Sequence, residues 1–140
     1  MRISKRKKKE FFISIFSILF ITIIFLNLKR LQVKFYNKTG EDIDSLIIGE
    51  TLIGHLKNEN STQKINFKEF TFNDNIPYEQ INGIVNNKKL DQLNWSSCGT
   101  GIETKSKGWY QFDIKKTLDK NGNTCLYLVE HNKKIFWEEE

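Results

Sequence analysis

Alanine is absent from this chain of 140 residues, and cysteine and histidine occur only twice each. Two cysteines and two histidines in unrelated contexts lack the paired spacing of a zinc site. The chain also lacks a His-Glu-x-x-His motif, a Gly-x-Ser-x-Gly motif and a calcium loop. We therefore expect no metal site, no cofactor and no catalytic residue, that is, a protein that is not an enzyme.

Lysine (19), isoleucine (18) and asparagine (14) take the place of the missing alanine. AT-rich codons produce this bias, so we expect a bacterial source with an AT-rich genome. Aromatic residues make up 13% of the chain, which is enough for a folded core and excludes a disordered protein.

Excess positive charge is missing from all but the first ten residues. The formal net charge is +5, and residues 1–10 supply all of it, with six basic residues beside Glu10. Residues 11–140 balance 16 basic against 16 acidic groups, and the part from Leu31 onward carries 14 against 16. A nucleic-acid-binding domain needs a basic surface. We therefore expect no nucleic-acid partner.

Charged residues are also missing from residues 11–28. A helix of that length spans about 27 Å, close to the ~30 Å hydrocarbon core of a bilayer. The exit from this run, residues 27–31, has no small-x-small cleavage site and no cysteine that could be lipidated. We therefore predict an uncleaved signal anchor, with a cleaved signal peptide and a buried helix of a soluble protein as alternatives.

The distribution of basic residues predicts the orientation of this anchor. Six basic residues precede the apolar run, and four follow it closely: Lys29, Arg30, Lys34 and Lys38. Because loops rich in lysine and arginine stay cytoplasmic, we predict a cytoplasmic head at residues 1–10, a transmembrane helix at 11–28 and an outer domain at 29–140. The protein is then a single-pass protein of the cytoplasmic (inner) membrane, with the lipid bilayer as a partner and its C-terminal domain periplasmic or extracellular.

Short segments with strand patterns fill the rest of the chain. Residues 31–36, 65–67 and 110–114 alternate between apolar and polar side chains, which is typical of strands with one buried face. Residues 46–48 and 126–129 are apolar at consecutive positions, which predicts central strands covered on both faces.

Turn residues separate these segments: Thr39-Gly40, Gly49, Asn82-Gly83, Asn86-Asn87 and, above all, Asn121-Gly122. We expect the last two strands at residues 125–130 and 133–137, with the turn at His131. About eight short strands, and no helical periodicity beyond the apolar run, predict an all-β domain. It should be an antiparallel β-sandwich, immunoglobulin-like, or a small barrel.

Cys98 and Cys125 are 27 positions apart and would face an oxidising compartment. A disulfide between them would stabilise the domain by about 3.5 kcal/mol; two separate buried thiols and a reactive thiol are the alternatives. His55 and His131 are expected to be exposed or locally bonded turn residues, and no spacing supports a Cys–His nucleophile pair. Alternation places Asp113 on a solvated face.

Three aromatic residues give the best candidate for a binding surface. Tyr36, Trp95 and Trp109 fall at strand ends or on outward positions. Exposed tryptophan and tyrosine often mark surfaces that bind sugars or proteins. The alternative is that these rings pack on a second sheet.

The chain resembles a family of short, uncharacterised bacterial envelope proteins with a basic head, one membrane anchor and a β-rich outer domain. The segments that carry the resemblance are Asn37-Lys38-Thr39-Gly40, Ile53-Gly54-His55-Leu56, Pro77, Cys98-Gly99-Thr100-Gly101 and Gly108-Trp109-Tyr110. These motifs are structural, and the resemblance implies no functional residues.

These observations together predict a membrane-anchored binding or scaffolding module of the cell envelope, with an envelope protein or a glycan as its partner. The alternative from another class is a small accessory subunit that docks on a larger membrane complex through its transmembrane helix.

Overall fold

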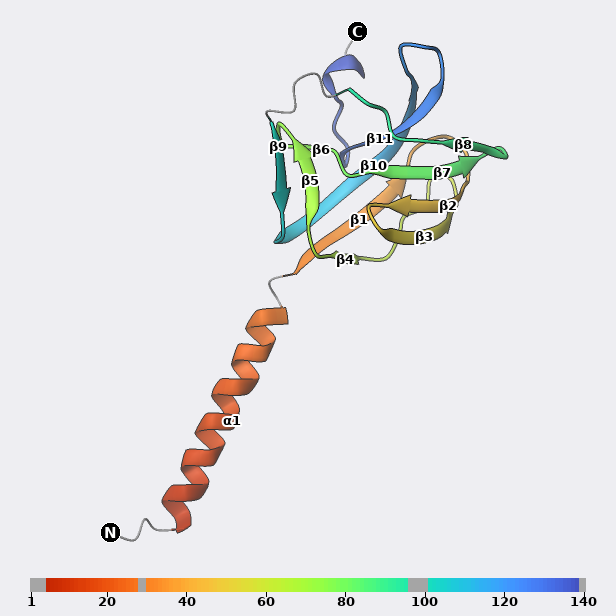
Figure 1. Cartoon of the computed structure of the whole chain (residues 1–140). Coiled ribbons are helices and arrows are strands. Elements are labelled where there is room, and N and C mark those ends of the chain that lie inside the picture. The colour runs from red at the N-terminus through yellow and green to blue at the C-terminus, as the bar shows by residue number, and fades with distance from the viewer. Residues whose placement is uncertain (1–4, 28–29, 96–100, 139–140) are drawn as a thin grey trace. The chain divides into compact units, whose positions relative to one another are not determined.

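The computed structural model describes residues 5–27, 30–95 and 101–138, and the chain divides into two compact units after Arg30. The first unit contains helix α1, Lys5–Asn27 (Figure 1). Within it, Lys7–Leu26 is long and apolar enough to cross a membrane by length and composition. The helix begins six residues before the apolar run, because the lysine and arginine residues of the head are good helix formers.

The second unit, from Leu31 onward, consists mainly of strands in three sheets (Figure 1). Sheet A has the order β11-β10-β1-β4, sheet B the order β3-β2-β7-β8 and sheet C the order β6-β5-β9. The strands are β1 Leu31–Asn37, β2 Ile43–Ile48, β3 Thr51–Leu56, β4 Ile65–Phe67, β5 Phe70–Asn73, β6 Ile76–Pro77, β7 Ile81–Val85, β8 Lys88–Leu90, β9 Ile102–Lys105, β10 Gly108–Leu118 and β11 Thr124–Glu130. Each sheet ends in two edge strands, so the described residues form no closed barrel, and the small-barrel alternative is wrong.

One pair of strands departs from the predicted antiparallel arrangement. β1 and β10 run parallel, with Leu31 opposite Gly108 and Asn37 opposite Ile114. The other pairings within the three sheets are antiparallel. Alternation of side chains carries no information on direction, and no tight hairpin joins these two distant segments.

The main core lies between sheets A and B and extends to sheet C. Leu31, Val33 and Phe35 are fully buried, which confirms the alternation predicted for β1. Across the parallel pair, the ring centroids of Phe35 and Phe112 are 6.2 Å apart. Sheet B contributes Ile43, Leu46, Ile48, Ile81, Val85 and Leu90, and sheet C contributes Phe70 and Phe72.

Strand β11 is covered on both faces as predicted, yet it is an edge strand of sheet A and not a central one. Leu126 and Leu128 belong to the main core, whereas Tyr127 and Val129 belong to a second, smaller cluster on the other face. The segment 91–93 covers the outer edge of β11 through backbone hydrogen bonds with Leu126. Edge strands need such cover because unpaired backbone groups promote association.

The end of the chain differs from the sequence prediction. Residues 133–137 form no strand, and the 3-10 helix η1, Phe136–Glu138, lies in their place. His55 is not in a turn either, since it lies within β3. The turn at Asn86-Asn87 is confirmed: it joins β7 and β8, and both residues have the positive φ angles that such hairpins require. The predicted turn at Asn82-Gly83 is wrong, because both residues lie within β7 and pair with neighbouring strands.

Candidate functional site

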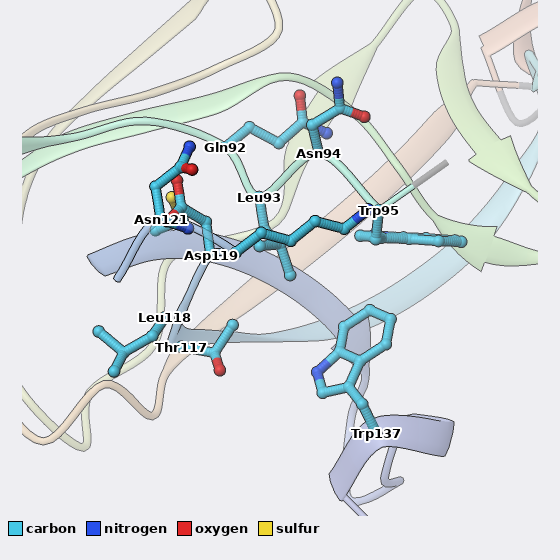
Figure 2. A pocket seen from close by; sticks show the side chains of 11 residues that line it. Gln92, Leu93, Asn94, Trp95, Thr117, Leu118, Asp119, Asn121 and Trp137 are labelled. Carbon is cyan, nitrogen blue, oxygen red and sulfur yellow. The ribbon is translucent and has the colours of Figure 1, made fainter. Parts of the chain in front are cut away.

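A cleft of about 620 Å³ opens beside the start of β11. Its walls come from the segment 92–95, the β10–β11 connection, Cys125 and Trp137. Figure 2 shows the indoles of Trp95 and Trp137 at one end of the cleft and the side chains of Asp119 and Asn121 at the other. The cleft is therefore apolar at one end and polar at the other.

An aromatic cluster forms the apolar end. The ring centroids of Trp95 and Trp137 are 5.5 Å apart, and Tyr78 lies edge-on to Trp95 at 4.9 Å. Tyr127 lies edge-on to Trp137 at 5.5 Å. Offset and edge-to-face contacts of this kind hold aromatic rings in fixed orientations. Both indoles stay half-buried, so each keeps surface available to a ligand.

Glu138 fixes the C-terminal segment that carries Trp137. Its carboxylate accepts hydrogen bonds from Lys115 Nζ at 2.8 Å, from the Tyr127 hydroxyl at 2.5 Å and from the backbone N–H of Ile135 at 2.9 Å. Burial raises the pKa of Glu138, but these bonds outweigh burial and leave the pKa below its usual range. Burial and the neighbouring Glu138 raise the pKa of Tyr127 well above its ordinary value. At neutral pH the carboxylate is charged and the phenol is not.

Asp119 fixes the polar end. Its Oδ1 accepts the backbone N–H groups of Asn121 and Asn123, each at 2.8 Å, and its Oδ2 accepts the side-chain amide of Asn123. Gly122 completes the turn with a φ of 78°. The hydrogen bonds from Asn123 hold the pKa of Asp119 below its ordinary value. The predicted turn at Asn121-Gly122 is confirmed, and these hydrogen bonds fix its backbone and the Asp119 side chain.

The cleft carries no net charge. Asp119 and Lys120 are the two charged residues that line it. Asn94 accepts a hydrogen bond from the Tyr78 hydroxyl at 3.1 Å, which leaves its amide N–H groups for other partners. Within the described residues, the Asn121 side chain makes no hydrogen bond. Two indoles, two adaptable amides and no net charge suit an uncharged polar ligand with an apolar face.

Cys125 lines the same cleft, and Cys98 lies outside the described residues, so the disulfide stays a prediction. Burial raises the pKa of the Cys125 thiol, and the charges of Asp119 and Asp91 raise it further. His131 follows the far end of β11, about 20 Å along the strand from Cys125. The described residues therefore give this thiol neither a base nor the lowered pKa of an active nucleophile.

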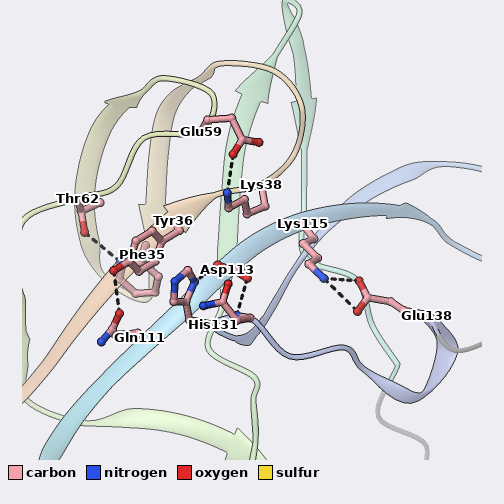
Figure 3. A network of polar contacts seen from close by, with 11 residues as sticks. Phe35, Tyr36, Lys38, Glu59, Thr62, Gln111, Asp113, Lys115, His131 and Glu138 are labelled. Atoms are coloured by element: carbon pink, nitrogen blue, oxygen red, sulfur yellow. Dashed lines mark hydrogen bonds and ion pairs between the residues drawn. The ribbon is translucent and has the colours of Figure 1, made fainter.

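Tyr36 lies away from the cleft, on the outer face of sheet A (Figure 3). Its ring stacks on that of His131 at 3.8 Å, and its hydroxyl donates to Gln111 at 2.8 Å. His131 Nδ1 lies 2.6 Å from a carboxylate oxygen of Asp113, whose other oxygen accepts the N–H of Asn132.

Asp113 is only 4% exposed, so its predicted place on a solvated face is wrong. The alternation assigned it to the outer face correctly, but His131 and the turn that follows β11 cover that face at this point. His131 is half-buried for the same reason. It lies in the turn that follows β11 and is bonded to Asp113, which confirms the prediction of a locally bonded turn residue.

Trp109 also lies on the outer face of sheet A, and 53% of it is exposed. Lys64 Nζ lies 5.1 Å from the centroid of its ring. Of the three predicted binding residues, Tyr36 and Trp109 therefore share one face on the neighbouring strands β1 and β10, whereas Trp95 belongs to the cleft.

Sequence reasoning missed Trp137 and the turn at Asp119 as parts of the site. The order Asp-Lys-Asn-Gly-Asn at residues 119–123 is a signal for a side-chain-capped turn, and it could have pointed to Asp119. Trp137 carried no comparable signal, because the segment that holds it was expected to form a strand. No group of three or more metal-ligating side chains occurs in the part of the chain that the structure describes.

Comparisons with protein-family models, with curated proteins and with solved structures found no match.

Proposed function

We propose that this protein is a membrane-anchored, extracytoplasmic β-sandwich that binds an uncharged glycan of the cell envelope in the cleft between Trp95 and Asn121. The observation that carries the proposal is the pairing of two half-buried indoles with free amide groups across one cleft. Sugars present an apolar ring face to indoles and hydroxyl groups to amides, so this arrangement suits them.

The shared core supports the sandwich arrangement. Apolar residues of sheet A, such as Val33 and Ile114, and of sheet B, such as Leu46, belong to one cluster. Two sheets that bury side chains against each other in this way are typical of sandwiches. The apolar helix Lys7–Leu26 and the surplus of basic residues before it support an anchor with the N-terminus in the cytoplasm.

The helix itself favours a simple anchor over a docking element. The side-chain hydroxyls of Ser17 and Thr22 donate to the backbone carbonyls of Ile13 and Ile18 in the same helix. Hydroxyl groups bonded in this way can face lipid, and their O–H donors are not available to another helix. Replacing residues 11–28 with an unrelated apolar span should therefore leave ligand binding unchanged, whereas an accessory subunit would lose its function.

The binding site can be tested with the full chain in lipid nanodiscs. Titration with chitotetraose and with a panel of other uncharged oligosaccharides should change the intrinsic tryptophan fluorescence. Trp95→Ala should weaken binding by about ten-fold or more, because it removes one aromatic wall of the cleft. Trp109→Ala removes an exposed indole from the other surface and serves as the matched control. Binding that survives Trp95→Ala, or no response to any oligosaccharide, would overturn the glycan site.

A further inference from the structure

A second surface, away from the cleft, combines cations with aromatic rings on the outer face of sheet A. It comprises Lys34 and Tyr36 on β1, Trp109 on β10 and Lys64 next to β4, and we call it the β1–β10 face. Lys34 Nζ lies 5.1 Å from the centroid of the Tyr36 ring, and Lys64 Nζ lies at the same distance from the Trp109 ring. Each lysine thus extends over an aromatic side chain.

The charges on this face are unbalanced. Among the described residues, Lys34 and Lys64 form no ion pair. At the margin of the face, Glu130 forms an ion pair with Lys133 at 2.7 Å, so Asp113, hydrogen-bonded to His131, is set against the two charges of Lys34 and Lys64. The face is therefore locally cationic, although the chain from Leu31 onward has more acidic than basic residues.

The short segment between α1 and β1 limits how far this face can lie from the end of the helix. Only three residues separate the end of α1 at Asn27 from the start of β1 at Leu31. Four extended Cα steps reach about 14 Å, so Leu31 stays within that distance of the helix end in any arrangement of the two units. Trp109 is the register partner of Gln32, the second residue of β1.

We propose that the β1–β10 face binds the anionic lipid headgroups of the membrane in which α1 anchors the chain. Lys34 and Lys64 supply the charge that attracts lipid phosphates, at about 1 kcal/mol for each basic residue near the surface. Trp109 supplies the amphipathic ring that favours the headgroup region. Because the rest of the domain is acidic, an anionic membrane repels its other faces and selects this one.

This inference rests on the anchoring proposed above and not on the glycan cleft. Loss of glycan binding in Trp95→Ala leaves it untouched, and failure of the full chain to insert into a bilayer would overturn both the anchor and this face. A short tether also favours lipid over a dissolved acidic partner, since the membrane is always within reach of Leu31.

The three tryptophan indoles give a test in the unmodified chain. The full chain is placed in nanodiscs that carry a gadolinium-chelating lipid, either zwitterionic or with about one third anionic lipid. Gadolinium broadens the NMR signals of nuclei that lie close to the membrane surface. The indole N–H signal of Trp109 should therefore lose most of its intensity in the anionic discs and much less in the zwitterionic ones, while the signals of Trp95 and Trp137 serve as internal references. About 1 M salt shortens the Debye length to ~3 Å and should restore the Trp109 signal.

A pair of variants separates this face from general charge. Lys34→Gln with Lys64→Gln should reduce the loss of the Trp109 signal in anionic discs to the zwitterionic level. Lys57→Gln with Lys88→Gln removes the same charge from exposed positions elsewhere and should leave that loss unchanged. The indole spectrum without gadolinium shows whether each variant is folded. Equal loss in both lipids, equal effects of the two pairs, or stronger loss at Trp95 would overturn the proposal.

Discussion

The outer face of sheet A has a covered end and an open end. At the covered end, Leu93, Trp95, Ile135 and Trp137 pack with Tyr127 and Val129 and leave the neutral cleft beside them. At the open end, Trp109 is 53% exposed, and two lysines lie over aromatic rings, Lys64 over Trp109 itself. Alternation along a strand therefore determines which face of the sheet a side chain lies on, whereas segments distant in the sequence determine whether that face is exposed to solvent.

The covered end should respond most strongly to the predicted disulfide. Reduction of a Cys98–Cys125 bond should lower the free energy of unfolding by about 3.5 kcal/mol, because the closed loop restricts the unfolded chain. Chemical denaturation with and without reductant measures this difference. Cys98→Ser and Cys125→Ser should each abolish it, and full labelling of both thiols in the oxidised, unfolded protein would rule the disulfide out.

Removing apolar contacts from the covering segment should have the next largest effect. Ile135→Ala should lower the free energy of unfolding by about 2–4 kcal/mol, because Ile135 is 3% exposed and packs in the second cluster. Leu118→Ala is the control: Leu118 is 64% exposed, so its loss should change stability by about 0.5 kcal/mol or less. Urea denaturation followed by near-ultraviolet circular dichroism gives both values; similar values would contradict the comparison.

Glu138 makes the covered end sensitive to acid. Glu138→Gln should destabilise the protein at pH 7 by about 1–2 kcal/mol, because it weakens charge-assisted bonds from Lys115 and Tyr127. The folded-state pKa of Glu138 is lowered, so its contribution is full above the unfolded pKa of about 4.3 and is lost as the pH falls through the folded pKa. Unfolding free energies of both proteins should converge towards pH 3; a constant gap would contradict this origin.

The open end should have the smallest effect on stability. Trp109→Ala should change the free energy of unfolding by about 0.5 kcal/mol or less, since the side chain is more than half exposed. Trp137→Ala should cost clearly more, because that indole packs on both Trp95 and Tyr127. Thermal denaturation of the two variants compares them directly, and a larger loss for Trp109→Ala would show that the open end is part of the core.

Local patterns predicted the strands better than their arrangement. Alternation predicted the buried side of β1 and the burial of Phe112 and Ile114 in β10, because apolar and polar residues alternate along a strand that has one buried face. Parallel and antiparallel neighbours give the same alternation, so the pattern could not predict the parallel pairing of β1 with β10. The position of β11 at an edge was missed because the chain itself covers that edge.

The candidate site was predicted only where one residue carried its own signal. Trp95 was expected on a binding surface because tryptophan is large and amphipathic, and it does line the cleft. Asp119 carries a local turn signal, but its place beside Trp95, like that of Trp137, depends on contacts between segments far apart in the sequence, which no local pattern records. Asp113 shows the converse, since its correct parity gave the wrong exposure once His131 covered it.

The parallel pairing of β1 with β10 also determines how late the core of the domain can form. In the topology proposed above, β1 would be the first strand to leave the membrane during export, and its parallel partner begins only at Gly108. Until then, the apolar side of β1 lacks its main neighbour, because contacts between distant segments form late. We expect the domain to stay unfolded through most of its translocation and to complete its core only when β10 has emerged.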